Sequence, residues 1–411
     1  MLSPYRVLDL ASGGSCLCGR ILGDLGADVI KIESPAGDPT RSIGPFVGDT
    51  PGPEKSLFWF AYNSNKKGIT LDIGHPQGRE LFKRLAQSAD FLIESFPPGH
   101  MESLGLGYEV LRGLNRGLIM ASITPFGQDG PYRDYAATDI VGMAMGGQMF
   151  STGEPDRAPV RIGFPQAYLH AGAEAAAGLT LALYHRSGTG EGQHVDVSMQ
   201  ASLTLTSGSA IPTWVTLGRE LPRVGNYRAG LGGGTLIRQQ YPCKDGFVAF
   251  AIIGGTSGAR SNRPLFEWMD REHMSDDFIR NIDWDSFHVP STPPEVMARI
   301  EQQVGLFFMT HTKMELYQGA MERHIMLYPL ATPQDILENQ QLEARQFWTE
   351  MEHPELERSI IYPGPFMKAS AVGCTMRRRA PLIGEHNREV FETELGLAQE
   401  ELAALKCDGV I

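Results

Sequence analysis

Short apolar runs alternate with stretches of helical periodicity through the first third of the chain. The runs are rich in Val, Ile and Leu, as strands buried on both faces of a parallel sheet are, and cover residues 7–10, 29–32, 68–72, 91–94 and 118–123. Helical spacing fills residues 16–25 and 78–88, and the second stretch follows Pro76, a residue favoured at helix starts. Repeated β-α-β units of this kind predict an α/β fold with a doubly wound sheet.

The pattern changes in the second half of the chain. A small-residue helix is expected over residues 173–183, and a long apolar, Ser/Thr-rich helix after residue 196. Residues 211–240 hold prolines and a glycine cluster, which indicates a linker and loop. A hairpin turning at Asp245-Gly246 is expected over residues 243–250, and helices over residues 260–325.

Size and charge narrow the functional classes. A chain of 411 residues exceeds the usual single core, so two domains are expected. The net charge of -12 argues against nonspecific binding of nucleic acid or of an anionic membrane. No apolar run reaches the roughly 20 residues of a membrane span, and no leader precedes the first strand, so a cytoplasmic protein is expected.

The five cysteines are scattered, which is typical of a reducing compartment. Cys16 and Cys18 have no second Cys or His pair at zinc spacing. We therefore expect buried free thiols and no metal site.

Several motifs, in the same order along the whole chain, resemble those of the family III CoA-transferases of the formyl-CoA transferase type. The matching segments are residues 7–10 with 23–33, Asn-Lys-Lys-Gly-Ile-Thr-Leu-Asp at 65–72, Glu-Ser-Phe-Pro-Pro-Gly at 94–99, and Arg-Ala-Pro-Leu-Ile-Gly-Glu-His at 379–386. The resemblance implies a large Rossmann-like domain, a small α+β domain, and a dimer of interlocked rings. The large domain would take residues 1–210 and 330–411, and the small domain residues 225–325.

The catalytic segment of that family has the frame Gly-x-Pro-x-x-Asp-x-x-x-Gly, in which the aspartate is the nucleophile. Gly163, Pro165 and Gly172 keep the frame, but Tyr168 occupies the aspartate position. In these enzymes the carboxylate attacks a CoA thioester and forms a mixed anhydride. A phenol with a pKa near 10 would form only an unreactive ester. No residue of the chain is therefore assigned as catalytic.

The resemblance also implies where CoA would bind. The expected contacts are Leu71, Asp72, Ile73, Ser95, Phe96, Leu104, Asp139 and a glycine loop of Gly232, Gly233 and Gly234. Three polar residues of the family pattern are replaced, by Gly74, Ser95 and Pro97, which should weaken the grip on CoA phosphates. Lys31, Arg41, Lys66 and Lys67 remain, as a solvated surface or as part of a nucleotide site.

Three hypotheses follow. The first is a degenerate subunit that pairs with an Asp-bearing paralogous subunit, as in succinyl-CoA:(R)-benzylsuccinate CoA-transferase, whose aspartate-lacking subunit the chain is similar to. Its substrates would be a CoA thioester, such as succinyl-CoA, and a carboxylic acid, such as benzylsuccinate. The second is a self-sufficient homodimer with a relocated nucleophile, Glu174 or Glu94. The third is a noncatalytic acyl-CoA-binding protein. In each, CoA is a substrate moiety or ligand and no resident cofactor is expected.

Overall fold

The computed structural model describes residues 1–229 and 236–411. The chain divides into two compact units, which we describe separately. The first unit consists of Met1–Met149, Arg161–Gly218 and Glu343–Ile411, and the second of Phe150–Val160 and Arg219–Leu342.

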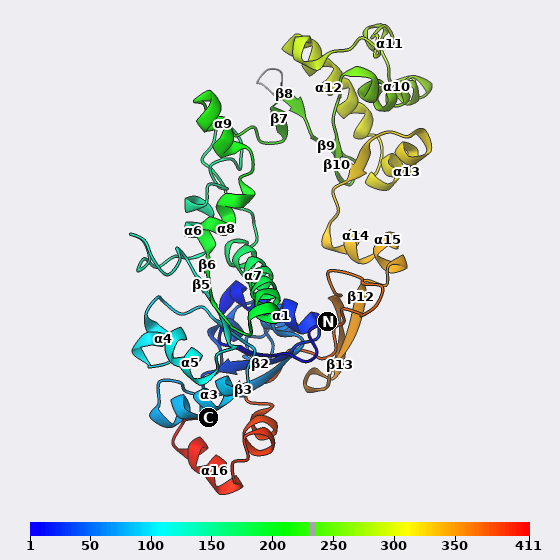
Figure 1. The fold of residues 1–411 in the computed structure, drawn as a ribbon. Coiled ribbons are helices and arrows are strands. Elements are labelled where there is room, and N and C mark those ends of the chain that lie inside the picture. The colour runs from blue at the N-terminus through cyan, green and yellow to red at the C-terminus, as the bar shows by residue number, and fades with distance from the viewer. Residues whose placement is uncertain (230–235) are drawn as a thin grey trace. The chain divides into compact units, whose positions relative to one another are not determined.

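The first unit is built on a six-stranded parallel sheet with the strand order β3-β2-β1-β4-β5-β6 (Figure 1). The order reverses direction between β1 and β4, as it does in doubly wound folds. The strands are β1 (Arg6–Asp9), β2 (Asp28–Glu33), β3 (Lys66–Thr70), β4 (Phe91–Glu94), β5 (Ile119–Thr124) and β6 (His194–Ser198).

Helices cover both faces of this sheet because successive strand residues point to opposite sides. One face packs against α1 (Cys16–Asp24), α7 (Ala167–Thr189) and α8 (Met199–Thr206). The other packs against α3 (Pro76–Gln87), α4 (His100–Ser103), α5 (Tyr108–Leu114) and residues near the C-terminus, including Val390 and Phe391. The remaining elements of this unit are α2 (Leu57–Asn63), α6 (Asp139–Met145), α9 (Ala210–Leu217), the hairpin β12 (Trp348–His353) and β13 (Arg358–Pro363), a π-helical segment (Arg388–Glu394) and α16 (Gln399–Cys407).

The second unit has its own apolar core around a three-stranded antiparallel sheet. Its strands are β9 (Gln240–Cys243), β10 (Gly246–Phe250) and β11 (Leu327–Pro329), and a separate ribbon pairs β7 (Tyr227–Ala229) with β8 (Leu236–Arg238). The helices are α10 (Gly255–Arg271), α11 (Asp277–Arg280), α12 (Pro294–Phe308), α13 (Lys313–Arg323) and α14 (Pro333–Leu337), and α15 (Gln340–Ala344) spans the boundary between the units.

The structure confirms the parallel strands, the hairpin at residues 243–250 and the helical content of residues 260–325. Two expectations are wrong. The long helix expected after residue 196 is split into α8 and α9, with Gly208 at a positive φ between them. Residues 211–240 are not all loop, because α9, β7 and β8 fall within or overlap them. The domain boundaries expected from the resemblance stay a prediction, since compactness alone does not define an independently folding domain.

No helix among the described residues is long and apolar enough to span a bilayer. Four of the cysteines, Cys16 and Cys18 included, are buried free thiols, and Cys407 is exposed. Burial raises the pKa of Cys16 to about 12, so this thiol stays protonated.

Candidate functional site at the carboxyl edge of the sheet

The loops that follow β1 and β4 meet at the point where the strand order reverses. The backbone N–H of Ser12 donates to the Ser95 hydroxyl at 2.9 Å, which joins the two loops. The hydroxyl of Ser12 donates in turn to Asp38 at 3.0 Å. Open α/β sheets bind ligands in the crevice at this switch point, so the candidate site lies where the fold places it.

Asp38 is held by a buried cation. Lys31 is fully buried, and its ammonium lies 3.0 Å from Asp38 and donates to the Ala11 carbonyl. Burial alone would raise the pKa of Asp38, but Lys31 and Thr40 lower it to about 2. The pair fixes the loop after β1 against the loop after β2, and sequence reasoning missed it because ion-pair partners are not encoded by spacing.

The expectation of a solvated surface is wrong for three of the four basic residues. Lys31, Lys66 and Arg41 are at most 1% exposed, and they pair with Asp38, Asp9 and Glu33 respectively. Lys67 is partly exposed and pairs with Asp28, Glu389 and Glu394. Because these charges are already neutralised, they do not form a free phosphate cradle.

Most of the expected CoA contacts gather on one side of the sheet. Leu71 and Ile73, which follow β3, are buried in the same apolar cluster that Phe96 and Leu104 pack against. Asp72 accepts a hydrogen bond from the N–H of Gly74 at 2.8 Å. Since the two aliphatic side chains point into the core, a ligand at this segment would meet chiefly backbone groups and the partly exposed Phe96.

Asp139, the first residue of α6, lies apart from that group, against the N-terminus of α7. Its Oδ1 accepts hydrogen bonds from the backbone N–H groups of Gln166 and Ala167, both at 2.7 Å. Its Oδ2 is buried without a hydrogen bond, and Arg161 lies 3.5 Å away as an ion pair. The carboxylate therefore satisfies the free N–H groups at the helix N-terminus, where a negative charge is favourable.

Tyr168 occupies the first turn of α7, beside Asp139. Its hydroxyl donates to the Ala137 carbonyl at 3.1 Å, and its Cβ lies against the loop after β1, since a Cβ on Gly14 would come within 2.9 Å of it. Burial and the charge of Asp139 raise the pKa of the Tyr168 phenol. At neutral pH the side chain is a protonated, engaged phenol, which is a poor nucleophile.

The two glutamates considered as replacements differ in position. Glu174 is half-buried on α7, about 1.7 turns after Tyr168. Glu94 is 3% exposed at the end of β4, and its Oε2 accepts the N–H of Phe96 at 2.7 Å. The Glu94 carboxyl thus faces the backbone two residues further along the chain and not the solvent.

Glu94 belongs to a polar chain that the sequence motifs did not reveal. The hydroxyl of Ser122 hydrogen-bonds the Glu94 carboxyl, and it also lies 2.8 Å from Nε2 of His194. Sheet register explains the cluster, because Glu94 pairs with Ser122 and Ser122 pairs with Asp196 across the parallel strands β4, β5 and β6. The sequence feature that could have revealed this cluster is a polar residue in each of three otherwise apolar strands, at positions that pair with one another.

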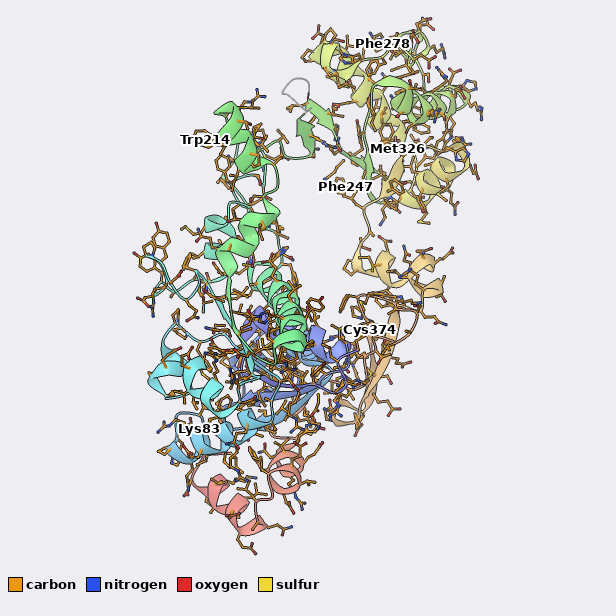
Figure 2. The ribbon with its side chains drawn as sticks, viewed as in Figure 1. Lys83, Trp214, Phe247, Phe278, Met326 and Cys374 are labelled. Atoms are coloured by element: carbon orange, nitrogen blue, oxygen red, sulfur yellow. The ribbon has the colours of Figure 1, made fainter. Side chains whose placement is uncertain are left out.

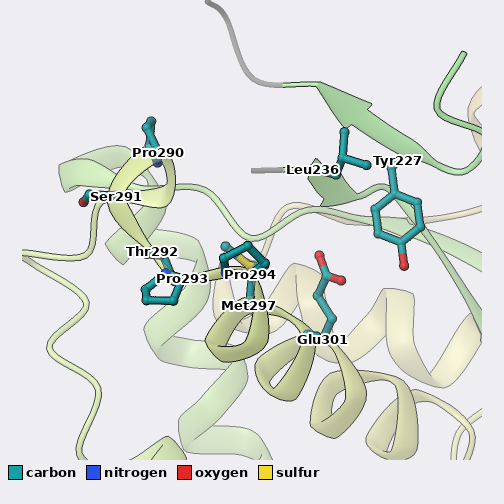
Figure 3. A pocket seen from close by; sticks show the side chains of 10 residues that line it. Tyr227, Leu236, Pro290, Ser291, Thr292, Pro293, Pro294, Met297 and Glu301 are labelled. Atoms are coloured by element: carbon teal, nitrogen blue, oxygen red, sulfur yellow. The ribbon is translucent and has the colours of Figure 1, made fainter. Parts of the chain in front are cut away.

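The second unit contains a pocket of about 710 Å³ (Figure 3). Its walls are largely apolar, and the carboxyl of Glu301 accepts the N–H of Arg238 at 2.8 Å. None of the expected site residues that the structure describes lines this pocket. Gly232, Gly233 and Gly234, expected as a glycine loop over the site, lie outside the described residues.

Comparisons with known proteins identify the family. A family model described as CoA-transferase family III matches residues 2–387. Succinyl-CoA:(R)-benzylsuccinate CoA-transferase subunit BbsE of Thauera aromatica is 34% identical over 95% of this chain and 93% of its own. Succinyl-CoA–D-citramalate CoA-transferase of Chloroflexus aurantiacus is 33% identical over 100% and 98%. The crystal structure of a CAIB/BAIF family protein from Brucella suis aligns with a TM-score of 0.80 and 27% identity over 95% of this chain and 98% of that one. With a match of this extent, the chain belongs to CoA-transferase family III.

Proposed function

We propose that this chain is the catalytically degenerate subunit of a heteromeric family III CoA-transferase, whose nucleophilic aspartate comes from a paralogous subunit. The observation that carries the proposal is Tyr168, a protonated phenol bonded to the Ala137 carbonyl at the position where the family frame needs a carboxylate. The similarity to BbsE, which is itself a transferase subunit, supports it.

The proposed reaction moves CoA from an acyl-CoA to another carboxylic acid. Two similar relatives use succinyl-CoA by name, which supports succinyl-CoA as the donor. The acceptor is then a carboxylic acid of the benzylsuccinate kind. CoA takes part as a substrate moiety, and the proposal needs no resident cofactor or metal.

This chain would contribute binding surface and shape. The segment Leu71, Asp72 and Ile73 and the pair Ser95 and Phe96 lie at the carboxyl edge of the sheet, where doubly wound folds hold nucleotides. Asp139 keeps the α7 N-terminus in place.

The partner would cover apolar surface that the first unit leaves exposed. Helices α8 and α9 present Leu205, Ile211, Trp214, Val215 and Leu217, each more than half exposed (Figure 2 labels Trp214). An interlocked-ring heteromer with the Asp-bearing subunit would bury such a face.

The decisive test is reconstitution. The chain is purified alone and also co-expressed with an Asp-bearing paralogue from the same genome, and transfer from succinyl-CoA to benzylsuccinate is followed by chromatography of the CoA esters. We expect no transfer by the chain alone and transfer by the complex. Transfer by the chain alone at the rate of the complex would overturn the proposal.

The alternatives give different results. A homodimer that uses Glu94 or Glu174 would form an acyl adduct on this chain, and hydroxylamine would trap it as a mass shift on one tryptic peptide. A noncatalytic binder would show tight acyl-CoA binding by calorimetry and no effect of any paralogue. Glu94 is unfavourable as a nucleophile because its carboxyl is buried and bonded to Phe96 and Ser122.

A further inference from the structure

A buried carboxyl lies directly beneath the segment assigned to CoA. Glu94 immediately precedes Ser95 and Phe96, and its Oε2 accepts the Phe96 N–H at 2.7 Å. The side chain is 3% exposed, yet no ion-pair distance to a Lys or Arg is found for it among the described residues. The other buried carboxyls of the first unit each have a buried Lys or Arg beside them; they are Asp9, Asp24, Glu33 and Asp38.

The groups that face Glu94 are neutral or acidic. Glu102 on α4 and Asp196 on β6 act on it electrostatically, and the Ser122 hydroxyl on β5 hydrogen-bonds it. Directly after β1 the neighbouring residue is the apolar Leu10, whose N–H donates to the carbonyl of Ile93, and Asp9, the last residue of β1, is paired with Lys66. His100 of α4 contacts the Phe96 ring, with centroids 4.6 Å apart.

These surroundings favour the protonated carboxyl. Burial, and then the charges of Glu102 and Asp196, raise the pKa of Glu94 to about 7, although the hydrogen bonds from Ser122 and Phe96 oppose the rise. The ordinary pKa of a glutamate is near 4.3, so the group changes charge in the neutral range in the folded protein.

A route for the proton leads outward from this carboxyl. Ser122 touches both Glu94 and Nε2 of His194, and the half-buried His194 ring stacks on Tyr108 with centroids 5.4 Å apart. Burial lowers the pKa of His194, so its ring is neutral and can take up a proton at one nitrogen while it gives up another from the second. Nδ1 takes up a proton from a hydronium ion of the solvent, Nε2 gives its proton to Ser122, and Ser122 gives its own to Glu94. The proton taken from solvent thus ends on the carboxylate, Ser122 is again neutral, and His194 is left as the neutral Nδ1–H tautomer.

We infer that Glu94 takes up a proton when the CoA polyanion binds at Ser95 and Phe96, with Ser122 and His194 as its relay. The inference rests on the proposed function, because it assigns CoA to this segment. An anionic ligand disfavours an ionised carboxylate a few ångströms away, and neutral Glu94 still accepts the Phe96 N–H through Oε2. Glu94 is therefore a positioning residue whose charge state is coupled to ligand binding.

The sign of the pH dependence follows. Ligand binding raises the affinity of Glu94 for its proton, so CoA must bind more tightly as pH falls through the neutral range. For each unit by which CoA raises the pKa of Glu94, the dissociation constant of CoA differs at most tenfold between low pH, where Glu94 is protonated, and high pH, where it is ionised. We expect a several-fold weakening from pH 6 to pH 8 in the unaltered protein.

Calorimetry of CoA binding in buffers of different ionisation enthalpy tests the coupling, with the chain in its heteromer or alone. Glu94→Gln keeps an acceptor for Phe96 and mimics the neutral acid, so we expect proton uptake to fall and affinity to become flat with pH beyond what the phosphates of CoA contribute. Glu109→Gln, which removes an exposed carboxylate of α5, is the matched control and should retain the uptake. Equal proton uptake by the unaltered protein and Glu94→Gln would overturn the inference.

A measurement without ligand separates this inference from the proposed function. Infrared difference spectra between pH 6 and pH 8 should contain the carbonyl band of a buried carboxylic acid that is absent from Glu94→Gln. Absence of that band in the unaltered protein contradicts a titrating Glu94. If the band is present but neither protein binds CoA, the assignment of CoA to this segment fails, and the coupling fails with it.

Discussion

At the scale of single residues, the structure changes the meaning of Tyr168. The sequence frame identified the position, and the missing carboxylate could be inferred from it. The bond to the Ala137 carbonyl and the neighbouring charge of Asp139 could not be inferred, because both depend on how the segment before α6 folds back onto α7. Tyr168 is thus held in place by its hydrogen bond and by the apolar cluster that it packs against.

Tyr168→Asp should restore little or no transfer activity to the isolated chain. The polar residues of the family pattern that Gly74, Ser95 and Pro97 replace would still be missing, so the new carboxylate would meet a weakly held CoA ester. The rate of CoA transfer from succinyl-CoA measures this. Activity equal to that of the heteromer would show that the rest of the site is intact and would contradict the expectation.

Tyr168→Phe serves as the control for that variant. It removes only the hydroxyl that donates to Ala137, so the free energy of unfolding should fall by about 1 kcal/mol. Transfer by the heteromer should stay unchanged, because the phenol takes no part in the chemistry.

At the scale of elements, the close approach of α7 to α1 and to the loop after β1 defines the site. Sequence periodicity predicted the strands and the small residues of α7, because both follow from burial on one or two faces. It did not predict that α7 begins at Ala167, nor the buried pairs of Lys31 and Lys66. Helix starts and buried ion pairs depend on tertiary contacts, here with Asp139, Asp38 and Asp9, which periodicity does not encode.

Gly172→Ala should destabilise the first unit more than Gly188→Ala, although both lie on α7. A Cβ at Gly172 would come within 3.2 Å of the Gly14 carbonyl and 3.3 Å of the Cys18 N, whereas one at Gly188 meets nothing within 4 Å. We expect a loss of about 1–3 kcal/mol at Gly172 from overpacking, and a gain of up to about 1 kcal/mol at Gly188 from helix propensity. Chemical denaturation measures both, and equal effects would mean that this contact relaxes freely.

At the scale of the whole molecule, the exposed apolar face of α8 and α9 is the surface to which the proposed function assigns the Asp-bearing subunit. Val215 is 75% exposed and Leu205 is 74% exposed, and full burial of one such side chain is worth about 1.5–3 kcal/mol. The family resemblance led us to expect an assembly, but the residues that would carry it became visible only with the structure.

Val215→Glu should therefore weaken association with the Asp-bearing subunit at least about tenfold, which corresponds to roughly 1.4 kcal/mol. A buried, unpaired carboxylate costs more than the lost apolar contact. Val110→Glu, a substitution of the same kind on the 48%-exposed Val110 of α5, is the control and should associate normally. Sedimentation of the mixed subunits measures the difference, and identical behaviour of the two variants would exclude α9 from the interface.

The environment of Lys66 bears on a chemical hazard that any thioester-handling protein meets. Acyl-CoA esters react slowly with free amines in solution, and such adventitious acylation needs an unprotonated nitrogen lone pair. Lys66 is fully buried, and its ammonium donates to Asp9, to the Cys16 carbonyl and to Asn63, so all three of its protons are engaged. Prolonged exposure to succinyl-CoA would consequently acylate exposed amines such as Lys368 and leave Lys66, at the start of β3, unmodified.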